Sequence, residues 1–111
     1  MDTKLSKALD FSQYMTTLNN QKRLLWEKYQ ESLIYYSNGG KFTITPELIA
    51  YCHSAILDNV VLIDDNTLPI KVKLQEFLFD IRVQFDKASV EYHEEYSKLK
   101  TKRKIEDLIE V

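Results

Sequence analysis

The two glycines and two prolines of this chain all fall between residues 38 and 69, and this clustering constrains the fold more than any other feature. Glycine and proline are the residues that most strongly interrupt helices and strands. The stretches on either side, residues 2–36 and 72–109, contain neither. Both stretches carry apolar residues at three- and four-residue spacing, which is typical of an amphipathic helix. We therefore expect two long helices that flank a central segment of turns and short elements.

The first predicted helix spans residues 2–36 and has an apolar seam along one face. The seam is made by Ala8, Phe11, Met15, Leu18, Leu25, Tyr29 and Tyr36. Near the helix end the apolar face broadens through four further residues, Trp26, Leu33, Ile34 and Tyr35. A broader face indicates packing against a second neighbour. Asn38-Gly39-Gly40 is expected to end the helix, because Asn and Gly readily adopt the left-handed conformation found at helix C-termini.

The central segment, residues 38–71, combines strand, helix and turn signals. Phe42-Thr43-Ile44 alternates apolar and polar residues and is typical of a short strand. Thr45 is expected to cap the start of a short helix that has Pro46 at its first position. That helix is predicted to end near Asp58-Asn59.

A hairpin is predicted in the second half of the central segment. Val60–Ile63 is an apolar run, Asp64–Thr67 contains turn-forming residues, and the apolar pattern resumes at Leu68-Pro69-Ile70. Pro69 cannot donate a hydrogen bond to a sheet, so we expect its strand to lie at an edge or to turn that position toward solvent. Together with Phe42–Ile44, this hairpin predicts a small sheet of two or three strands.

The second predicted helix spans residues 72–109 and repeats the same spacing. Its seam is made by Leu74, Leu78, Ile81, Phe85, Ala88, Tyr92 and Leu99. Four further apolar residues are expected to widen this face next to the central segment, and they are Phe77, Phe79, Val83 and Val90. Two seams of similar length, joined by a compact reversal, predict an antiparallel helical hairpin.

The expected fold is mainly α with a minor α+β part, in a single domain over residues 1–111. Residues 2–36 form the first arm and residues 72–109 the second, and the two long helices run antiparallel. An α/β cap over residues 38–71 connects them, with one short helix and a two- or three-stranded β-sheet. A chain of 111 residues can bury only a modest core.

No pattern in the sequence predicts an enzyme, a cofactor or a metal site. Cys52 and His53 are adjacent, so on a helix their side chains point about 100° apart. His93 lacks the second histidine four residues away that a zinc-binding helix needs. Asp64–Thr67 resembles the start of a calcium loop, but the Gly and the Glu required at its sixth and twelfth positions are missing. We therefore expect Cys52 to be a small buried apolar residue and the acidic run to be a tight turn.

A basic run near the C-terminus is the strongest charge feature. It consists of Lys98, Lys100, Lys102, Arg103 and Lys104. The net charge of the chain is −2, so attraction to nucleic acid would depend on such a local patch, with Lys22, Arg23 and Lys28 as neighbours. The alternative is an ordinary solvated helix surface, because acidic residues stand four positions from most of the run and can form ion pairs.

Seven tyrosines and one tryptophan are more than two helical seams need. The candidate partner surface consists of Tyr14, Trp26, Tyr35 and Tyr51. Aromatic residues of this kind are enriched in protein interfaces. Because each of two paired helices buries only one stripe, we expect a protein partner or a second subunit to cover the arms. Neither a small-molecule substrate nor a membrane is expected as a partner.

Three functions are consistent with these features. The leading hypothesis is a non-enzymatic helical interaction protein that acts through protein–protein contacts. The second is a nucleic-acid-associated accessory protein that uses residues 98–104. The third is a holdase-type chaperone, because long helices joined through a β element look like prefoldin in outline. The predicted helix from Pro46 to Asp58 departs from the prefoldin plan.

Three segments, Lys4–Phe11, Asn38–Phe42 and Leu62–Ile70, resemble small proteins of contractile-tailed phages (myophages) of marine cyanobacteria. The resemblance carries over no functional residues. It implies a viral context, in the host cytoplasm or in the virion. In that context the leading hypothesis becomes a phage accessory, assembly or host-factor-binding protein. No secretory signal is visible, and the longest apolar run has five residues against the roughly 20 needed to cross a bilayer. Secretion and membrane insertion are therefore not expected, while the partner and the oligomeric state stay open.

Overall fold

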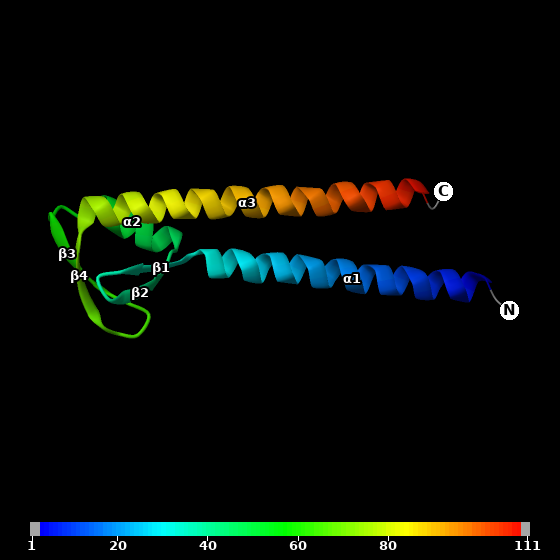
Figure 1. Ribbon diagram of the computed structural model, residues 1–111, viewed down its shortest axis with the longest axis horizontal. Coiled ribbons are helices and arrows are strands. Elements are labelled where there is room, and N and C mark those ends of the chain that lie inside the picture. The colour runs from blue at the N-terminus through cyan, green and yellow to red at the C-terminus, as the bar shows by residue number, and fades with distance from the viewer. Residues whose placement is uncertain (1–2, 110–111) are drawn as a thin grey trace. The chain divides into compact units, whose positions relative to one another are not determined.

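The computed structural model describes the backbone of residues 3–109 and the side chains of residues 7–101. This part of the chain is mainly helical, with three helices and two small antiparallel sheets. In chain order the elements are α1 (Thr3–Ser32), β1 (Ile34–Ser37), β2 (Gly40–Thr43), α2 (Pro46–Ser54), β3 (Asn59–Ile63), β4 (Pro69–Lys73) and α3 (Leu74–Ile109), as labelled in Figure 1.

The chain divides into two compact units. Unit 1 comprises Met1–Lys28 and Tyr92–Val111, and its described residues belong to α1 and α3. Unit 2 comprises Tyr29–Glu91 and contains all four strands, α2, the end of α1 and the first half of α3. The two units are treated separately below.

Helix α1 ends at Ser32, so the prediction of a helix up to Tyr36 is wrong. Residues 34–37 form β1 instead, and Tyr36 is exposed. The amide of Gln84 donates hydrogen bonds of 2.8 Å to the carbonyls of Ser32 and Ile34. The last carbonyls of a helix have no hydrogen-bond partner within the helix. A side chain from α3 therefore stabilises the end of α1.

Asn38-Gly39 is the turn of a hairpin between β1 and β2, and not the end of a helix as expected from the sequence. Both residues have positive φ angles, 50° at Asn38 and 82° at Gly39. A two-residue hairpin turn of type I′ requires this conformation at both positions, and Asn-Gly is the pair that adopts it most readily. The register pairs Ile34 with Thr43 and Ser37 with Gly40.

The predicted hairpin over residues 60–70 is confirmed as β3 and β4, with Ile63 opposite Pro69. Pro69 is exposed at the first position of β4, where its missing N–H costs little. The prediction of one small sheet is wrong, because β1–β2 and β3–β4 form two separate two-stranded sheets. Helix α3 begins at Leu74, two residues later than expected, because β4 extends to Lys73.

Helix α2 starts as predicted. The Thr45 hydroxyl accepts a hydrogen bond of 3.1 Å from the backbone N–H of Leu48, and Pro46 is the first helical residue. The helix ends at Ser54, earlier than the predicted Asp58-Asn59. Ala55 already has an extended backbone, and the next residues lead into β3.

Asp64 connects the two hairpins. Its side chain is buried, with 5% of the residue exposed. One carboxylate oxygen accepts from the N–H groups of Asn66 and Leu68, at 3.0 and 2.8 Å, and shapes the β3–β4 turn. The other oxygen accepts from the N–H of Lys41 in β2, at 3.0 Å. The hydrogen bond from Lys41, with those from Leu68 and Asn66, lowers the pKa of Asp64 against the opposing effect of burial.

Two further contacts reinforce this connection. Asp65 donates its N–H to the Lys41 carbonyl at 2.8 Å, and its carboxylate accepts the Thr43 hydroxyl at 2.6 Å. The Asn38 side-chain amide donates to the Lys71 carbonyl of β4 at 2.9 Å. The two sheets are therefore joined by side chains of the turns and by one backbone hydrogen bond, and not by a shared ladder.

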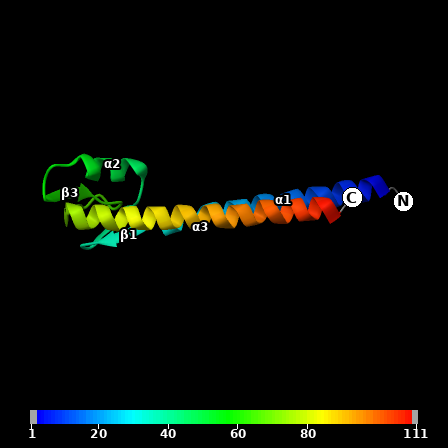
Figure 2. The ribbon, with the colours of Figure 1, turned by 90° about the horizontal axis from the view of Figure 1, so that it is seen from above.

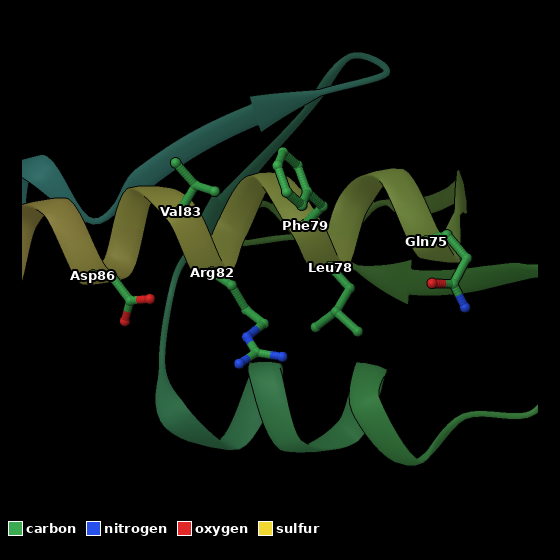
Figure 3. Close-up of a pocket in the computed structure, with 6 residues that line it drawn as sticks. All are labelled: Gln75, Leu78, Phe79, Arg82, Val83 and Asp86. Carbon is green, nitrogen blue, oxygen red and sulfur yellow. The ribbon is translucent and has the colours of Figure 1, made fainter.

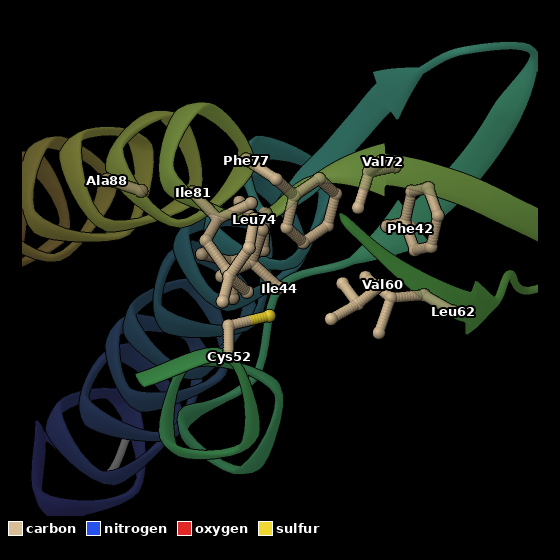
Figure 4. Packing of buried hydrophobic residues seen from close by; sticks show 11 residues of the cluster. Phe42, Ile44, Cys52, Val60, Leu62, Val72, Leu74, Phe77, Ile81 and Ala88 are labelled. Carbon is tan, nitrogen blue, oxygen red and sulfur yellow. The ribbon is translucent and has the colours of Figure 1, made fainter. Parts of the chain in front are cut away.

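The core of unit 2 lies between the two hairpins, α2 and α3, as Figure 4 shows. Its buried members are Leu33, Phe42, Ile44, Cys52, Val60, Leu62, Val72, Leu74, Phe77, Ile81 and Ala88. Phe77 forms edge-to-face contacts with Phe42 and Tyr35, at centroid distances of 5.1 and 5.6 Å. Such aromatic pairs contribute beyond the area they bury. Three of the seven seam residues predicted for the second helix, Leu74, Ile81 and Ala88, are buried in this core.

The lowered pKa of Asp64 predicts a pH-dependent stability. A carboxylate with a folded pKa below its unfolded value, about 3.9, stabilises the fold above that value and loses the contribution as pH falls through the folded pKa. In Asp64→Asn the side-chain NH₂ group is a donor and cannot accept the hydrogen bond from the N–H of Lys41. We therefore expect a lower melting temperature at pH 7. Thermal unfolding followed by circular dichroism should show this gap to wild type closing as pH drops below about 4.

Asp65→Asn is the matched control for Asp64→Asn. The Thr43 hydroxyl that donates to Asp65 can rotate and accept instead, so this variant should lose less stability. A gap between wild type and Asp64→Asn that stays constant from pH 7 to pH 3 would contradict a role for the charge.

Substitution of either adjacent glycine, Gly39 or Gly40, by alanine is expected to lower stability, for a different reason at each position. A Cβ on Gly40 would lie 2.6 Å from Cγ1 of Ile70, so Gly40→Ala should lower the free energy of unfolding by about 1–3 kcal/mol through overpacking. Gly39 has open space around it but a φ of 82°, so Gly39→Ala should cost about 1–2 kcal/mol through backbone strain. Gly39→Asn should recover most of that loss. Urea unfolding measures all three, and equal losses for Gly39→Asn and Gly39→Ala would contradict the type I′ turn.

Candidate functional site

Unit 1 buries few side chains. Among its residues with described side chains, 7–28 and 92–101, only Leu18 is buried, with 4% exposed. Several apolar residues of α1 in this unit are more than half exposed, and they are Leu9, Phe11, Leu24 and Trp26. The seam predicted for the first arm is therefore only partly used, since Ala8 and Phe11 also face solvent.

Aromatic and charged contacts connect α1 and α3 within unit 1. The Trp26 and Tyr92 rings lie 5.9 Å apart at an angle of 59°. Lys28 Nζ donates to Glu95 Oε1 at 2.7 Å, and Lys22 Nζ lies 5.8 Å from the centre of the Tyr96 ring. Lys22 lies nearer the start of α1 than Trp26, and its partner Tyr96 lies further along α3 than Tyr92, so these two contacts run in opposite directions along the two helices.

An apolar groove lies on the surface between α1 and α3 of unit 1, and we call it the leucine groove. Leu24, Leu25 and Leu99 supply its apolar lining, and Gln21, Glu95 and Lys98 complete it. Its volume is about 320 Å³. Leu24 is 56% exposed there. Leu24 lies outside the predicted seam, although an adjacent Leu24-Leu25 pair indicates a face wider than one stripe.

The basic run is partly placed by the structure. Lys98 and Lys100 are exposed, and Lys100 Nζ lies 5.3 Å from the centre of the Tyr96 ring, the same ring that Lys22 approaches. Lys102, Arg103 and Lys104 lie outside the residues whose side chains are described.

Two of the three basic residues expected beside the run are engaged by acidic neighbours. Arg23 pairs with Glu27 at 3.8 Å, and Lys28 pairs with Glu95. Of the three expected neighbours, Lys22 is therefore the one that can add its charge to Lys98 and Lys100 of the basic run.

A second apolar surface lies on the α3 segment of unit 2, and it corrects a prediction. Phe79, Val83 and Val90 were expected to widen the core-facing side of the helix, yet they are 68%, 51% and 56% exposed. We call these three residues the outer face of α3. A groove on α3 is lined by Phe79 and Val83, which Figure 3 shows on one side of the helix, and by Leu78, Arg82 and Asp86 on the other. Only Phe77 of the predicted four is buried.

The surroundings leave the outer face open. Figure 2 shows α2 on one side of α3 and the β1–β2 hairpin on the other, and the close-up in Figure 3 agrees. The groove is lined by α3 residues alone, from Gln75 to Asp86. A spacing of four, then seven residues separates Phe79, Val83 and Val90, so the sequence did contain the signal of a separate stripe.

The aromatic residues proposed as a partner surface have different environments. In unit 1 Tyr14 is half-buried and Trp26 packs on Tyr92. In unit 2 Tyr51 is exposed on α2, whereas Tyr35 is half-buried in β1. Tyr35 packs edge-on against Phe77 and donates its hydroxyl to Asp80 Oδ2 at 2.8 Å, so its contacts belong to the fold of unit 2.

A polar cleft in unit 2 surrounds Tyr35 and Asp80, with Lys73 and Glu76 in its lining. Burial raises the pKa of Tyr35, and the neighbouring carboxylate of Asp80 raises it further. A tyrosine with a raised pKa stays protonated at neutral pH and acts as a hydrogen-bond donor. In this cleft Tyr35 therefore orients Asp80.

Cys52 is buried among apolar side chains of the unit 2 core, as expected, and burial raises the pKa of its thiol. A raised pKa suppresses the reactive thiolate. His53 and His93 are both exposed. Over the described part of the chain, no three His, Cys, Asp or Glu side chains gather as a metal site would require.

Comparisons with protein-family models, curated proteins and solved structures found no match to this chain. Among the described residues, no helix has the length and apolar character needed to cross a membrane.

Proposed function

We propose that the chain is a non-enzymatic interaction protein whose unit 1 binds a helical segment of a partner protein. The observation that carries this proposal is the leucine groove, with apolar residues of α1 exposed along a helix pair that buries only Leu18 among its described side chains. Unit 2 has its own core of eleven buried residues. Unit 1 therefore exposes apolar side chains but, unlike unit 2, has no comparable buried core among its described residues.

The energetics favour a partner for unit 1. Helices gain most of their stability from packing an apolar face and not from intrinsic propensity. Burying one leucine-sized side chain contributes about 1.5–3 kcal/mol, and Leu24, Phe11 and Leu9 leave much of that contribution unused. An amphipathic helix lying in the groove would bury Leu24, Leu25 and Leu99 together, which is a common mode of peptide recognition.

An antiparallel hairpin of α1 and α3 is the arrangement that this proposal uses. The opposite direction of the contacts in unit 1 supports it, with Trp26 near Tyr92 and Lys22 near Tyr96. The resemblance of the sequence implies a phage context, and within it we propose an accessory, assembly or host-factor-binding role.

A second candidate function is nucleic-acid binding. The specific observation in its favour is that Lys22 and Lys100 converge on the ring of Tyr96, while Lys98 is exposed nearby in sequence on the same helix. Clustered lysines contact phosphates, and an aromatic side chain can stack on a base.

The leucine groove predicts which substitutions abolish partner binding. Leu24→Glu and Leu99→Glu should each reduce the amount of partner captured from native lysate by about tenfold or more, because a charge at the centre of an apolar contact is not solvated. Leu57→Glu is the matched control, since Leu57 is similarly exposed, at 63%, but lies in unit 2. Quantitative mass spectrometry of captured proteins makes the comparison, with circular dichroism to verify folding.

The pattern of capture separates the alternatives. One or a few proteins lost with Leu24→Glu and retained with Leu57→Glu support the proposal. Many unrelated unfolded proteins with the same dependence would favour the holdase-type chaperone. An identical set captured by wild type and all variants contradicts a function of the groove.

The nucleic-acid candidate predicts a steep salt dependence. Affinity for a duplex or single strand should fall as salt rises, with a slope reduced by about 0.7–0.9 for each phosphate contact removed. Lys98→Glu with Lys100→Glu should weaken binding, whereas Lys71→Glu with Lys73→Glu, which changes the net charge equally in β4, should not. Fluorescence anisotropy across a salt series measures this, and equal effects of the two pairs contradict a specific role of the basic run.

A further inference from the structure

The outer face of α3 lies directly opposite the side that packs on the unit 2 core. At 3.6 residues per turn, Phe79, Val83 and Val90 fall within an arc of about 40°. Ile81 and Ala88, both buried, lie on the reverse side of the helix. Single exposed apolar residues are ordinary, but three on one line of a helix form a stripe. Such a stripe is long enough to pair with another helix over three turns.

We propose that a second copy of this chain covers the outer face, with two α3 helices packed antiparallel. The proposal rests on the proposed function, that the chain acts through protein contacts, and it names one partner and one surface. It uses residues 79–90 of unit 2 and not the leucine groove.

The charges beside the stripe fit an antiparallel pair. In a coiled-coil heptad, Phe79 and Asp86 occupy d positions and Val83 and Val90 occupy a positions. A two-fold axis next to Gln84 then places Phe79 opposite Val90 of the second copy, and Val83 opposite Asp86. The same axis places Asp80 opposite Lys87 of the second copy, on the e flank of the helix, and both side chains are exposed. Symmetry repeats this ion pair, so two attractive contacts flank the apolar stripe.

Other arrangements bring like charges together. A parallel pair aligned in register sets Asp86 against Asp86 of the second copy at the centre, and Arg82 near Lys87 on the flanks. An antiparallel pair shifted by one heptad sets either Asp80 against Asp80 or Lys87 against Lys87. Like charges across such a seam destabilise the wrong register. The charge pattern therefore favours the antiparallel register, in which Asp86 lies beside Val83 of the second copy and not beside another carboxylate.

The fold of unit 2 orients the Asp80 side chain for this contact. Its Oδ2 accepts the Tyr35 hydroxyl at 2.8 Å. A carboxylate can accept further hydrogen bonds at its second oxygen, so Oδ1 remains for a lysine. Because Tyr35 fixes the side chain, less conformational freedom is lost when the pair forms.

The contact is small, so the dimer is expected to be weak. Three turns of helix on each side bury less than the roughly 1,200 Å² typical of a stable interface. A dissociation constant on the order of 10–100 µM is consistent with six apolar side chains and two exposed ion pairs. Sedimentation velocity over a concentration series up to about 1 mM covers this range.

Charge reversal provides the test. Asp80→Lys and Lys87→Glu should each weaken self-association by about tenfold, since each turns both ion pairs into repulsions. An equimolar mixture of the two variants should dimerise at least as strongly as wild type. In the mixed dimer, the lysine introduced at position 80 of one copy faces the glutamate introduced at position 87 of the other. Rescue by mixing also shows that each variant is folded. A parallel pair would give no such rescue.

An apolar pair of variants completes the experiment. Val83→Ala should weaken the dimer several-fold, whereas Val61→Ala, at a similarly exposed valine on β3, should leave it unchanged. A single monomeric species at every concentration, an oligomer insensitive to the charge reversals, or a mixture without rescue would each overturn the inference. A chain that stays monomeric but still loses its captured partner with Leu24→Glu would overturn this inference and leave the proposed function intact.

Discussion

The fold of unit 2 depends on the carboxylate of Asp64. Two-stranded hairpins are marginally stable on their own in water, and here neither extends the other's ladder. The buried carboxylate shapes the β3–β4 turn through two backbone N–H groups and holds β2 through the N–H of Lys41. Charge-assisted hydrogen bonds of this kind are stronger than neutral ones. With Phe42 and Val72 buried on either side of the connection, apolar packing and the polar contact stabilise the same arrangement.

This connection determines what α3 presents to its surroundings. Once the hairpins and α2 enclose Phe77 and Ile81, the inner side of α3 is fully used by the core. Phe79 and Val83 must then lie on the opposite side, because a helix cannot turn two opposed stripes toward one core. Their exposure follows from the position of the core and not from a loose structure. An apolar stripe that the fold cannot cover is the physical reason to look for another molecule.

The sequence predicted the parts of this fold that local chemistry determines. Thr45-Pro46 marked the start of α2, and the strands around Asp64–Thr67 were recognised from their spacing. The end of α1 was missed because Asn38-Gly39 suits both a helix end and a type I′ turn, and the choice depends on β2 and on the Gln84 side chain. The partner of Asp64 in β2 lies 23 residues away, and spacing alone carries no signal for such a contact.

The same limit applies to the candidate sites. The apolar character of Leu24 and Val83 is evident in the sequence, but whether each faces a core or solvent depends on which stripe the fold buries first. Both surfaces combine a short apolar stripe with charges at its margin, Glu95 and Lys98 in unit 1, Asp80 and Lys87 in unit 2. Apolar area supplies affinity without much direction, whereas charges at the margin penalise wrong registers and wrong partners. Selectivity at either surface is therefore expected to follow the charged margins, and affinity the leucines, valines and Phe79 between them.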